Sequence, residues 1–468
     1  MRIQFISLCM LAAVLLGSCS KDYLDINQTN PNQTQSPPIN GLLATVTNQT
    51  SQNVFRAANV SAYYTQQLAS PNASSGSDTY DNVDRSSLWY NVYNTVNDSR
   101  RMQALAVERS GFHHVGIAKI TEAMNMSLLI DFFGDAPYSK AWDPQNFFPA
   151  YDKAQDIFNA SLALIDQGIV ELRKTDALLR LDPASDLIHN GSTTAWIKTG
   201  YALKARLLNR LSKTPEYNPT NILAALALAY TSNADDAQVT RFVQRSSWNQ
   251  VAFNNTVLLL DGWLSDRFVK ALNGSTHGVF DPRLKYITDT TRFGDYRGTP
   301  NGRGRTGTGT NREESYLSVN GFYSRAGAPL MLVTFAEMKF IEAEATFATD
   351  KARSYTAYLQ GIAAHMDKIG VPTAEKNAYL ANPAVAVGAA NFTRVLLFKE
   401  KYVAMFLHPE AWTDARRIDY QYKDFTLPVN SILPAFIRRV GYPSTETDRN
   451  AKNVPNVTLL TEKLWWDK

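Results

Sequence analysis

Apolar side chains recur at helical spacing along most of this chain, and that periodicity restricts its fold more than any other feature. In residues 152–172, Ala154, Ile157, Phe158 and Ile165 fall on one helical face. Strand-like alternation is scarce, so the sequence predicts a mainly α-helical fold. The predicted helices cover residues 114–133, 152–172, 193–212, 220–231, 333–349, 353–369 and 390–407.

Several of these helices follow one another in pairs, as 333–349 and 353–369 do. Paired helices at regular intervals are typical of helix-turn-helix repeats, so we expect tetratricopeptide-like pairs. Two long segments, 61–100 and 254–328, lack this periodicity and are predicted to form an irregular, loop-rich lobe. Residues 20–55 are rich in Asn, Gln, Thr and Pro and predict an extended or turn-rich lead.

The amino terminus has the pattern of an export signal. Arg2 precedes an apolar run over 3–16, and Leu16-Gly17-Ser18-Cys19 follows. A short apolar run before small residues is typical of a cleaved signal peptide, here residues 1–18. The last four residues resemble a bacterial lipobox, which predicts that Cys19 carries a lipid; the alternative is an ordinary signal peptide with an incidental cysteine. Residues 19–468 are predicted to form a single domain.

Cysteine content agrees with such an anchor. The chain has only Cys9 and Cys19, and Cys9 lies in the predicted signal peptide. No internal disulfide is then possible in the mature chain, and no later apolar run approaches the roughly 20 residues that a spanning helix needs. Ser20-Lys21-Asp22 resembles the surface-export signal of Bacteroidetes lipoproteins, which predicts a lipid-anchored protein of the outer membrane, facing the cell surface.

Other classes of function find little support. A net charge of +4 is too small to suggest a nucleic-acid partner. The six histidines include no pair at i and i+4, so no metal site is predicted. Residues 302–307 match the letters of a dinucleotide-binding loop, but neither an apolar strand nor a helix flanks them. We therefore expect no cofactor and no catalytic residues, and interpret 298–311 as a mobile loop.

A different pattern suggests ligand recognition. The chain has 22 Tyr and 8 Trp, and such rings can stack on sugars while neighbouring polar groups bond the hydroxyls. Trp89, Tyr93 and Asn97 recur every four residues and share a helical face, although rings at this spacing also pack into cores. The candidate ligand residues of this segment are Asp78, Tyr80, Arg85, Trp89, Tyr93 and Asn97.

Several segments resemble a known family. Asp131-Phe132-Phe133-Gly134-Asp135-Ala136-Pro137-Tyr138-Ser139 resembles the D-x-x-G-D-x-P-Y-S segment of SusD/RagB-like lipoproteins. The order of the other similar segments agrees with that family, and the likeness is greatest to its SusD-like, starch-binding-associated branch. These segments are Pro149–Asp152, Ala202–Leu208, Phe280–Leu284, Phe335–Ala345, Pro409–Trp412 and Arg438-Arg439.

The resemblance implies a function as well as a fold. Members of this family capture nutrients, commonly glycans, and deliver them to a SusC-like TonB-dependent outer-membrane transporter. Their glycan site is formed by an early aromatic segment and by a loop of a later insertion. By this resemblance Trp89 would be the early stacking residue, and Trp263 or Tyr296 the contribution of the insertion.

Charged residues of these segments have structural interpretations. Asp131 and Asp135 are expected to cap or pair, and Arg416-Arg417 to hold helices together. The glutamates of the 335–345 helix are interpreted as a solvated face with local partners. Those glutamates are Glu337, Glu342 and Glu344.

Four hypotheses follow from the sequence. The first is a non-enzymatic lipoprotein that binds an oligosaccharide beside a transporter. The second keeps the fold but binds peptides or another nutrient. The third is a helical-repeat adaptor for other proteins. The fourth is a glycosidase, which requires two carboxylates about 5 to 10 Å apart in a cleft, and no motif in the chain suggests one.

Overall fold

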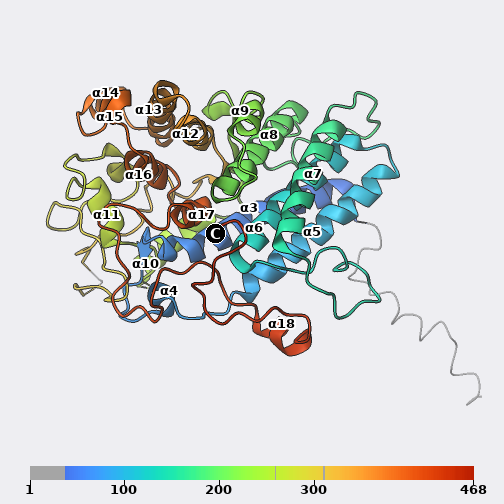
Figure 1. Ribbon diagram of the computed structural model, residues 1–468, viewed down its shortest axis with the longest axis horizontal. Helices are drawn as coiled ribbons and strands as arrows, with labels where there is room; N and C mark the ends of the chain where they lie inside the picture. The colour runs from blue at the N-terminus through green and yellow to red at the C-terminus, as the bar shows by residue number, and fades with distance from the viewer. Residues whose placement is uncertain (1–36, 259, 309–310) are drawn as a thin grey trace, which may run out of the picture.

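The computed structural model describes residues 37–258, 260–308 and 311–468, and within them the fold is mostly helical (Figure 1). Helices α5, α6 and α7 lie side by side on the right of the view, and α12 to α16 lie at the upper left. The predicted all-α fold class is confirmed. Strands are few and short among the described residues.

The first long helix begins where the sequence predicted an extended lead. α3 (Ile39–Tyr64) follows Pro38 directly, and a proline just before a helix is a common start. The prediction is therefore wrong for residues 39–55. The segment is polar yet buried, because its side chains bond to neighbouring helices: Asn53 Nδ2 donates to Asn125 Oδ1 at 2.8 Å, and Asn125 Nδ2 donates to Thr50 Oγ1 at 2.9 Å.

The segment 61–100, predicted to be irregular, is also largely helical. α3 extends to Tyr64, the short α4 covers Gly76–Thr79, and α5 (Ser86–Val107) covers the end of the segment, while residues 65–75 and 80–85 lie outside helices. The predicted helix of 114–133 is α6 (Phe112–Phe133), which is buried on nearly all sides. It is therefore the central helix of the first core.

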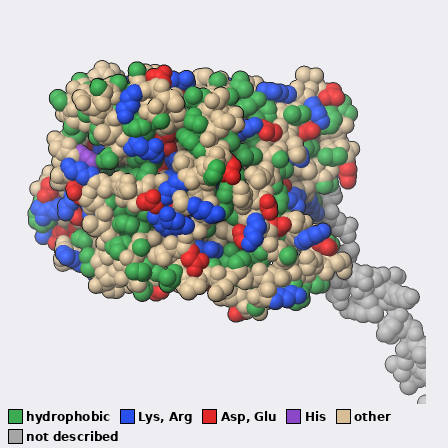
Figure 2. Space-filling model, in the orientation of Figure 1, with side chains coloured by type: hydrophobic (Ala, Val, Ile, Leu, Met, Phe, Trp, Pro, Cys, Tyr) green, Lys and Arg blue, Asp and Glu red, His purple; other side chains and the backbone are tan. Residues whose placement is uncertain are grey.

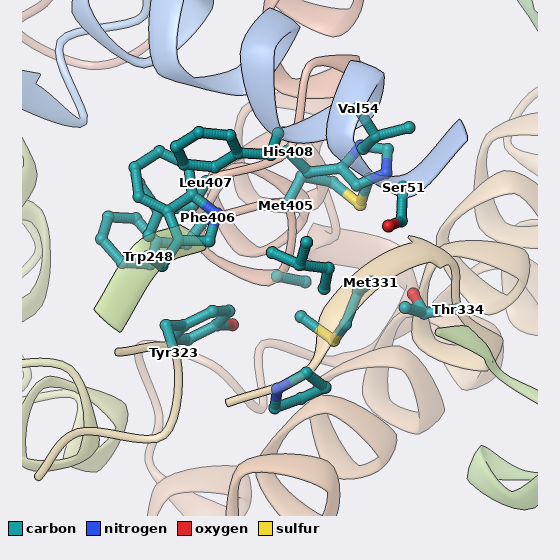
Figure 3. Close-up of a pocket in the computed structure, with 14 residues that line it drawn as sticks. Ser51, Val54, Trp248, Tyr323, Met331, Thr334, Met405, Phe406, Leu407 and His408 are labelled. Atoms are coloured by element: carbon teal, nitrogen blue, oxygen red, sulfur yellow. The ribbon is translucent and has the colours of Figure 1, made fainter. Parts of the chain in front are cut away.

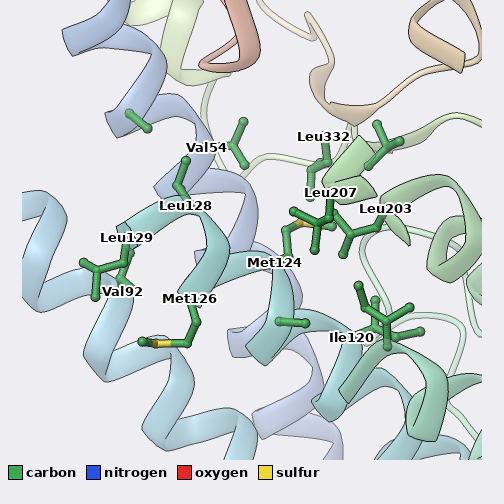
Figure 4. Packing of buried hydrophobic residues seen from close by; sticks show 14 of the residues in the cluster. Val54, Val92, Ile120, Met124, Met126, Leu128, Leu129, Leu203, Leu207 and Leu332 are labelled. Carbon is green, nitrogen blue, oxygen red and sulfur yellow. The ribbon is translucent and has the colours of Figure 1, made fainter. Parts of the chain in front are cut away.

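Close helix packing in this core depends on two glycines. α6 packs on α7 (Ala154–Leu172), and a Cβ at Gly116 would stand 2.8 Å from the carbonyl oxygen of Gly168. A Cβ at Gly168 would in turn stand 2.9 Å from the carbonyl oxygen of Gly116. Apolar side chains of α3, α5, α6 and α8 fill the neighbouring space (Figure 4).

The remaining predicted helices are present with shifted ends. The predicted pair 333–349 and 353–369 is confirmed as two helices that pack on each other, α12 and α13. The helix predicted over 390–407 is shorter than expected and begins at Arg394. These helices are α8 (Thr193–Arg210), α9 (Pro219–Leu226), α12 (Phe335–Thr346), α13 (Lys351–Ile369) and α16 (Arg394–Ala404).

Shorter elements complete the fold. Two antiparallel pairs of strands join distant parts of the chain: β1 with β3, and β2 with β4. The strands are β1 (Leu68–Ala69), β2 (Ala237–Val239), β3 (Trp263–Leu264) and β4 (Leu330–Val333). The other α-helices are α10 (Ser247–Thr256), α11 (Asp266–Leu272), α14 (Thr373–Ala381), α15 (Gly388–Asn391), α17 (Glu410–Arg417) and α18 (Ser444–Arg449), and the short 3-10 helices are η1 (Leu211–Lys213), η2 (Asn233–Asp235) and η3 (Pro282–Tyr286).

The apolar side chains form two cores that share α12. The first core is built on α3 and α5 to α9, and the second on α10, α11, α13 and α16. Met338 and Ile341 of α12 belong to the first core, whereas Phe340 and Ala343 belong to the second. Because one helix presents a face to each core, α12 joins the helical pairs to the less regular lobe.

Ion pairs are buried along the same boundary. Glu337 is 1% exposed and pairs with Arg206 at 2.6 Å, while Glu344 pairs with Lys401 at 2.5 Å and Arg417 at 2.8 Å. The prediction of a solvated face is therefore wrong for these two glutamates. Their chemistry explains the burial, since a charge can leave water when an opposite charge and hydrogen bonds replace it.

The predicted roles of Asp131 and Arg416 are confirmed. Asp131 pairs with Arg210 at 2.7 Å in the core. The guanidinium of Arg416 donates from Nη1 to the carbonyl oxygens of Asp131 and Arg438, at 2.7 and 2.9 Å. Arg416 thus holds α6, α17 and the carboxyl-terminal segment together.

Neither a membrane-spanning helix nor a metal-binding cluster occurs among the residues that the structure describes. Over residues 37–258, 260–308 and 311–468, none of the helices combines the length and apolarity needed to cross a bilayer. In that same part of the chain, His, Cys, Asp and Glu side chains form no group of three that could hold a metal ion. Cys19 and the predicted signal peptide lie outside the described residues.

Candidate functional site

Trp89, the leading stacking candidate, lies in the core rather than at the surface. Its side chain is 2% exposed, and its ring centroid stands 5.0 Å from that of Phe133 and 5.2 Å from that of Tyr93. The expectation of an exposed ring is wrong, because α5 turns this face toward α6. Trp89 supports the fold and leaves no open ring face for a ligand.

Tyr93 and Asn97, which share the helical face of Trp89, lie nearer the protein surface. Tyr93 is half-buried and donates from its hydroxyl to the carbonyl oxygen of Pro137 at 2.6 Å. Asn97, one turn later on α5, is exposed. Neither lines the cavity described below, and a ligand role for them stays a prediction.

Asp78 connects the early segment to the later insertion. Its carboxylate is buried and accepts hydrogen bonds from Ser70 N at 2.8 Å, Gly302 N at 3.1 Å and Asn301 Nδ2 at 2.8 Å. Burial raises the pKa of Asp78 to about 6, and these donors oppose the rise. The two segments that the family resemblance named do meet, through Asp78.

A third part of the chain joins the same place. Val429 N donates to Asn301 O at 3.0 Å, and Ile432 N donates to Thr79 O at 2.9 Å. Gly302 has a φ of +80°, and a Cβ there would stand 1.8 Å from the carbonyl oxygen of Val429. The backbone path at this junction therefore requires a glycine.

Tyr80 and Arg85 also have structural roles. Tyr80 is buried, and its ring centroid stands 6.0 Å from that of Tyr64. Arg85 Nη2 donates to the hydroxyl oxygens of Tyr64 and Ser77, each at 3.3 Å. Both residues fasten the segment between α4 and α5 to the end of α3.

Trp263, the first candidate of the insertion, is buried like Trp89. It is 1% exposed and lies in β3, which pairs with β1. Its ring centroid stands 5.8 Å from that of Tyr316, and its Nε1 donates to Asn255 Oδ1 at 3.0 Å. An exposed ring at Trp263 is therefore also a wrong expectation.

Tyr296, the second candidate, lines a large open cavity of about 500 Å³. One wall is α11, a second is the loop 293–300, and a third is formed by residues 306–307 and 313–314. The glycine-rich loop that was interpreted as mobile thus contributes to this cavity. The lining residues are Asp266, Val269, Lys270, Asn273, Phe293, Tyr296, Arg297, Gly298, Pro300, Thr306, Gly307, Glu313 and Glu314.

Two aromatic rings border this cavity. Tyr296 is half-buried, its ring centroid stands 5.9 Å from that of Phe280, and burial raises its pKa. Phe293 is 52% exposed and lies under the guanidinium of Arg297, whose Cζ is 4.3 Å from the ring centroid. Asn273 Nδ2 donates to the backbone oxygen of Tyr296 at 3.3 Å, which fixes the loop against the end of α11.

Charged groups around the cavity are mostly neutralised in pairs. Lys270 pairs with Asp266 at 2.7 Å, and Arg297 pairs with Asp295 at 2.7 Å. Glu313 pairs with Arg292, which lies just outside the lining residues, at 2.9 Å. The rim therefore offers many hydrogen-bond donors and acceptors without a strong field of one sign.

Both signs of charge are visible on the surface around α11, at the left edge of the view in Figure 2.

Glu314 is 3% exposed and accepts hydrogen bonds from Thr306 N at 2.7 Å and Thr306 Oγ1 at 2.9 Å. Glu314 thereby holds the loop wall in place, and side chains at the rim remain accessible.

Sequence reasoning found the region of this cavity but missed most of its residues. Phe293, Asn273 and Asp266 were not singled out. A signal was present in Arg292-Phe293-Gly294-Asp295-Tyr296-Arg297, which alternates rings with charged side chains around a glycine. Such a mixture suits a half-exposed recognition loop better than a core.

A second cavity, between α3, α10 and β4, has different chemistry (Figure 3). It holds only about 20 Å³ and is lined mostly by apolar side chains such as Trp248, Met331 and Phe406. His408 Nε2 donates to the carbonyl oxygen of Leu332, His408 Nδ1 accepts from Glu410 N, and burial lowers the pKa of His408 to about 4. A neutral histidine in a small apolar cavity offers no site for a polyol.

Comparison with known proteins identifies the family of this chain. A sequence model described as "Starch-binding associating with outer membrane" matches residues 28–443. The chain belongs to the SusD-like family. No curated protein sequence matches the chain. Members of the SusD-like family bind carbohydrate, associate with the outer membrane and are not enzymes, so the predicted absence of enzymatic activity is confirmed by membership.

Solved structures agree on the SusD-like fold. A SusD/RagB family protein from Bacteroides thetaiotaomicron superposes with a TM-score of 0.74 at 20% identity, covering 92% of this chain and 99% of its own. A SusD homolog from Bacteroides fragilis gives 0.74 at 20% identity, covering 91% and 99%. A chitin-binding SusD homolog from Flavobacterium johnsoniae gives 0.76 at 20% identity, covering 92% and 98%.

Proposed function

We propose that this SusD-like protein captures an oligosaccharide in the cavity lined by Tyr296 and delivers it to a SusC-like TonB-dependent transporter. The observation that carries the proposal is the cavity itself. Its volume of about 500 Å³ is within the range of small-molecule sites, and it combines accessible rings with a polar rim.

The chemistry of the rim suits a sugar. The C–H face of a pyranose packs on a flat ring such as that of Tyr296, and its hydroxyls exchange hydrogen bonds with side chains such as Asn273 and Asp266. A mostly apolar cavity would leave these hydroxyls unpaired at a cost of about 1–3 kcal/mol each. The small cavity beside Trp248 is therefore the poorer candidate.

Two further facts favour a glycan over a peptide. The family description names starch, and the Flavobacterium johnsoniae homolog is a chitin-binding protein. Peptides or another nutrient remain the alternative cargo for the same cavity. A peptide pool and a glycan array, run side by side on the purified protein, separate the two.

The proposed site of action is the cell surface. The Leu16-Gly17-Ser18-Cys19 sequence supports a lipid on Cys19, and the family associates with the outer membrane. An anchored protein stays close to a transporter in the same membrane, which raises the effective concentration of captured ligand at the transporter.

The test of the binding site is a Tyr296→Ala variant. Isothermal titration with chito-oligosaccharides and malto-oligosaccharides should show about a 10-fold to 100-fold weaker affinity for the bound series, because about 1.5–3 kcal/mol of ring burial is lost. Tyr90→Ala is the matched control, since Tyr90 is exposed on α5 and does not line the cavity. Unchanged affinity in Tyr296→Ala would remove the cavity from consideration.

The test of the partner is a pull-down from native outer membranes. A TonB-dependent transporter should be recovered in about equal amount with this protein, as one interface per partner requires. Recovery of other proteins with no transporter would support the helical-repeat adaptor instead.

A further inference from the structure

Each charged side chain that lines the proposed glycan cavity, apart from Glu314, belongs to an ion pair. Asp266 and Lys270 pair with each other at 2.7 Å. Arg297 and Glu313 pair with partners just outside the lining, at 2.7 and 2.9 Å. Glu314 forms no ion pair within the described residues and accepts hydrogen bonds only from Thr306. The lining therefore keeps one carboxylate that no cation compensates.

Glu314 also keeps one oxygen unused. The residue lines the cavity although it is 3% exposed. Its Oε1 accepts from Thr306 N at 2.7 Å and from Thr306 Oγ1 at 2.9 Å. Its Oε2 is buried and has no hydrogen-bond partner in the part of the chain that the structure describes. Burial removes the water that would otherwise donate to this oxygen, so the wall of the cavity lacks a donor that a ligand can supply.

The backbone next to Glu314 is fixed, which keeps the carboxylate in the wall. Ser315 N donates to Arg297 O at 2.6 Å, and Leu264 N donates to Ser315 O at 2.9 Å. Glu314 is thus fastened to the loop 293–300 on one side and to β3 on the other. A carboxylate held in this way is already positioned for a ligand before the ligand arrives.

The chemistry of the free oxygen favours a cationic donor over a neutral one. A hydrogen bond from an ammonium to a carboxylate is about twice as strong as one between neutral groups. An ammonium also brings the positive charge that the lining lacks, whereas a hydroxyl or an amide N–H brings only the donor. An acidic sugar would add a second negative charge beside Glu314, and the cations of the lining are already paired.

We infer that the cavity prefers an oligosaccharide with a free amine, an amino sugar such as glucosamine, and that its ammonium binds Glu314 Oε2. This inference rests on the proposed glycan function and names the class of sugar for the same cavity. Glu314 is then the residue that determines specificity, while Tyr296 provides the ring on which the sugar packs.

The first experiment compares oligomers of chitosan, chitin and cellulose of equal length. These three share one linkage and differ only in the group on the second carbon, which is an amine, an N-acetyl amide or a hydroxyl. Isothermal titration of the purified full chain is run at mildly acidic pH, where the amine is protonated. We expect the chitosan oligomer to bind about 10-fold or more tightly than the cellulose oligomer, with a ratio that falls as salt screens the charges.

The second experiment removes the charge of Glu314. Glu314→Gln keeps an acceptor for Thr306 but loses the negative charge, so the preference for chitosan over cellulose oligomers should disappear. Asp289→Asn is the matched control, because it removes one carboxylate of the same lobe that pairs with Arg312 and does not line the cavity. That variant should keep the preference. Thermal unfolding of both variants checks that they are folded.

Three results would overturn the inference. The first is equal affinity of the wild type for all three oligomers, which needs no variant. The second is a preference that survives in folded Glu314→Gln, and the third is an equal loss of preference in Asp289→Asn. If the wild type shows no amine preference while Tyr296→Ala weakens binding of all three oligomers, the glycan proposal stands and the assignment of the amine to Glu314 fails.

Discussion

Trp89 shows that one sequence spacing can indicate either a ligand-binding face or a buried core face of a helix. The i, i+4 spacing of Trp89 and Tyr93 predicts a shared helical face, and it does lie on α5. Spacing alone does not say which way that face turns. The structure turns it toward α6, where Phe133 covers the indole. Tyr296, without any helical pattern, is the candidate that lines an open cavity.

Replacing Trp89 with alanine should therefore act on stability. Trp89→Ala removes a buried indole and should lower the free energy of unfolding by about 3–5 kcal/mol, as measured by urea denaturation. Tyr90→Ala, its exposed neighbour, should change that value by less than about 1 kcal/mol. Glycan affinity of folded Trp89→Ala protein should match wild type, and a selective loss of affinity would restore Trp89 as a ligand contact.

Asp78 is a second single residue with a testable effect, because its contribution to the free energy of unfolding depends on pH. Its pKa is about 6 in the folded protein against an ordinary value of 3.8, so between these values the folded state holds the proton more tightly. Raising the pH through this window therefore lowers the free energy of unfolding, by about 3 kcal/mol from this group. Above pH 6 the contribution is constant.

The comparison with Asp78→Asn isolates this effect. The stability of wild type minus that of Asp78→Asn should fall between pH 4 and pH 6.5, because other carboxylates cancel in the difference. Urea denaturation at several pH values measures it. A difference that is flat or rises with pH would mean that the carboxylate is not buried as described.

At the scale of elements, the sequence predicts apolar helices well and polar buried helices poorly. The helices α6, α7, α8 and α13 have apolar periodicity, and their positions were predicted within a few residues. α3 was missed because its buried face includes Thr50 and Asn53, whose partners lie on other helices. Propensity cannot anticipate hydrogen bonds that exist only after tertiary packing.

The glutamates of α12 give a matched test of burial on one helix. Glu337→Gln leaves the buried Arg206 without its full partner and should cost about 3–5 kcal/mol of stability. Glu342→Gln disturbs only the more exposed pairs with Lys339 and Arg353 and should cost less than about 1 kcal/mol. Thermal unfolding of both variants measures this contrast. Equal losses would support the solvated-face interpretation that the structure contradicts.

At the scale of the whole molecule, family membership was predictable and the assembled site was not. The ordered segments from Asp131 to Arg439 led to the SusD-like family, which the match over residues 28–443 confirms. The cavity required knowledge of which loops meet. No sequence pattern indicates that residues 293–300, 306–307 and 313–314 form walls beside α11, because these contacts depend on backbone geometry rather than on periodicity.

The proposed anchor also acts on the whole molecule. Cys19→Ala should move the protein from the membrane fraction to the soluble fraction, because the several acyl chains that give stable attachment would be absent. Cell fractionation with immunoblotting measures this distribution. Glycan affinity should stay the same, since the substitution leaves every residue that lines the cavity unchanged. Membrane retention of the variant would contradict a lipid at this position.

The junction at Asp78 can form only after three distant segments of the chain are present. Segments 70–79, 301–302 and 429–432 are all needed there, and Asp78 and Gly302 are 224 residues apart. Contacts between such distant residues form late, after the local helices. A chain that ends before Val429 therefore has most of its helical pairs but lacks one of the three segments of this junction. Binding in the cavity beside this junction thus depends on nearly the whole length of the chain.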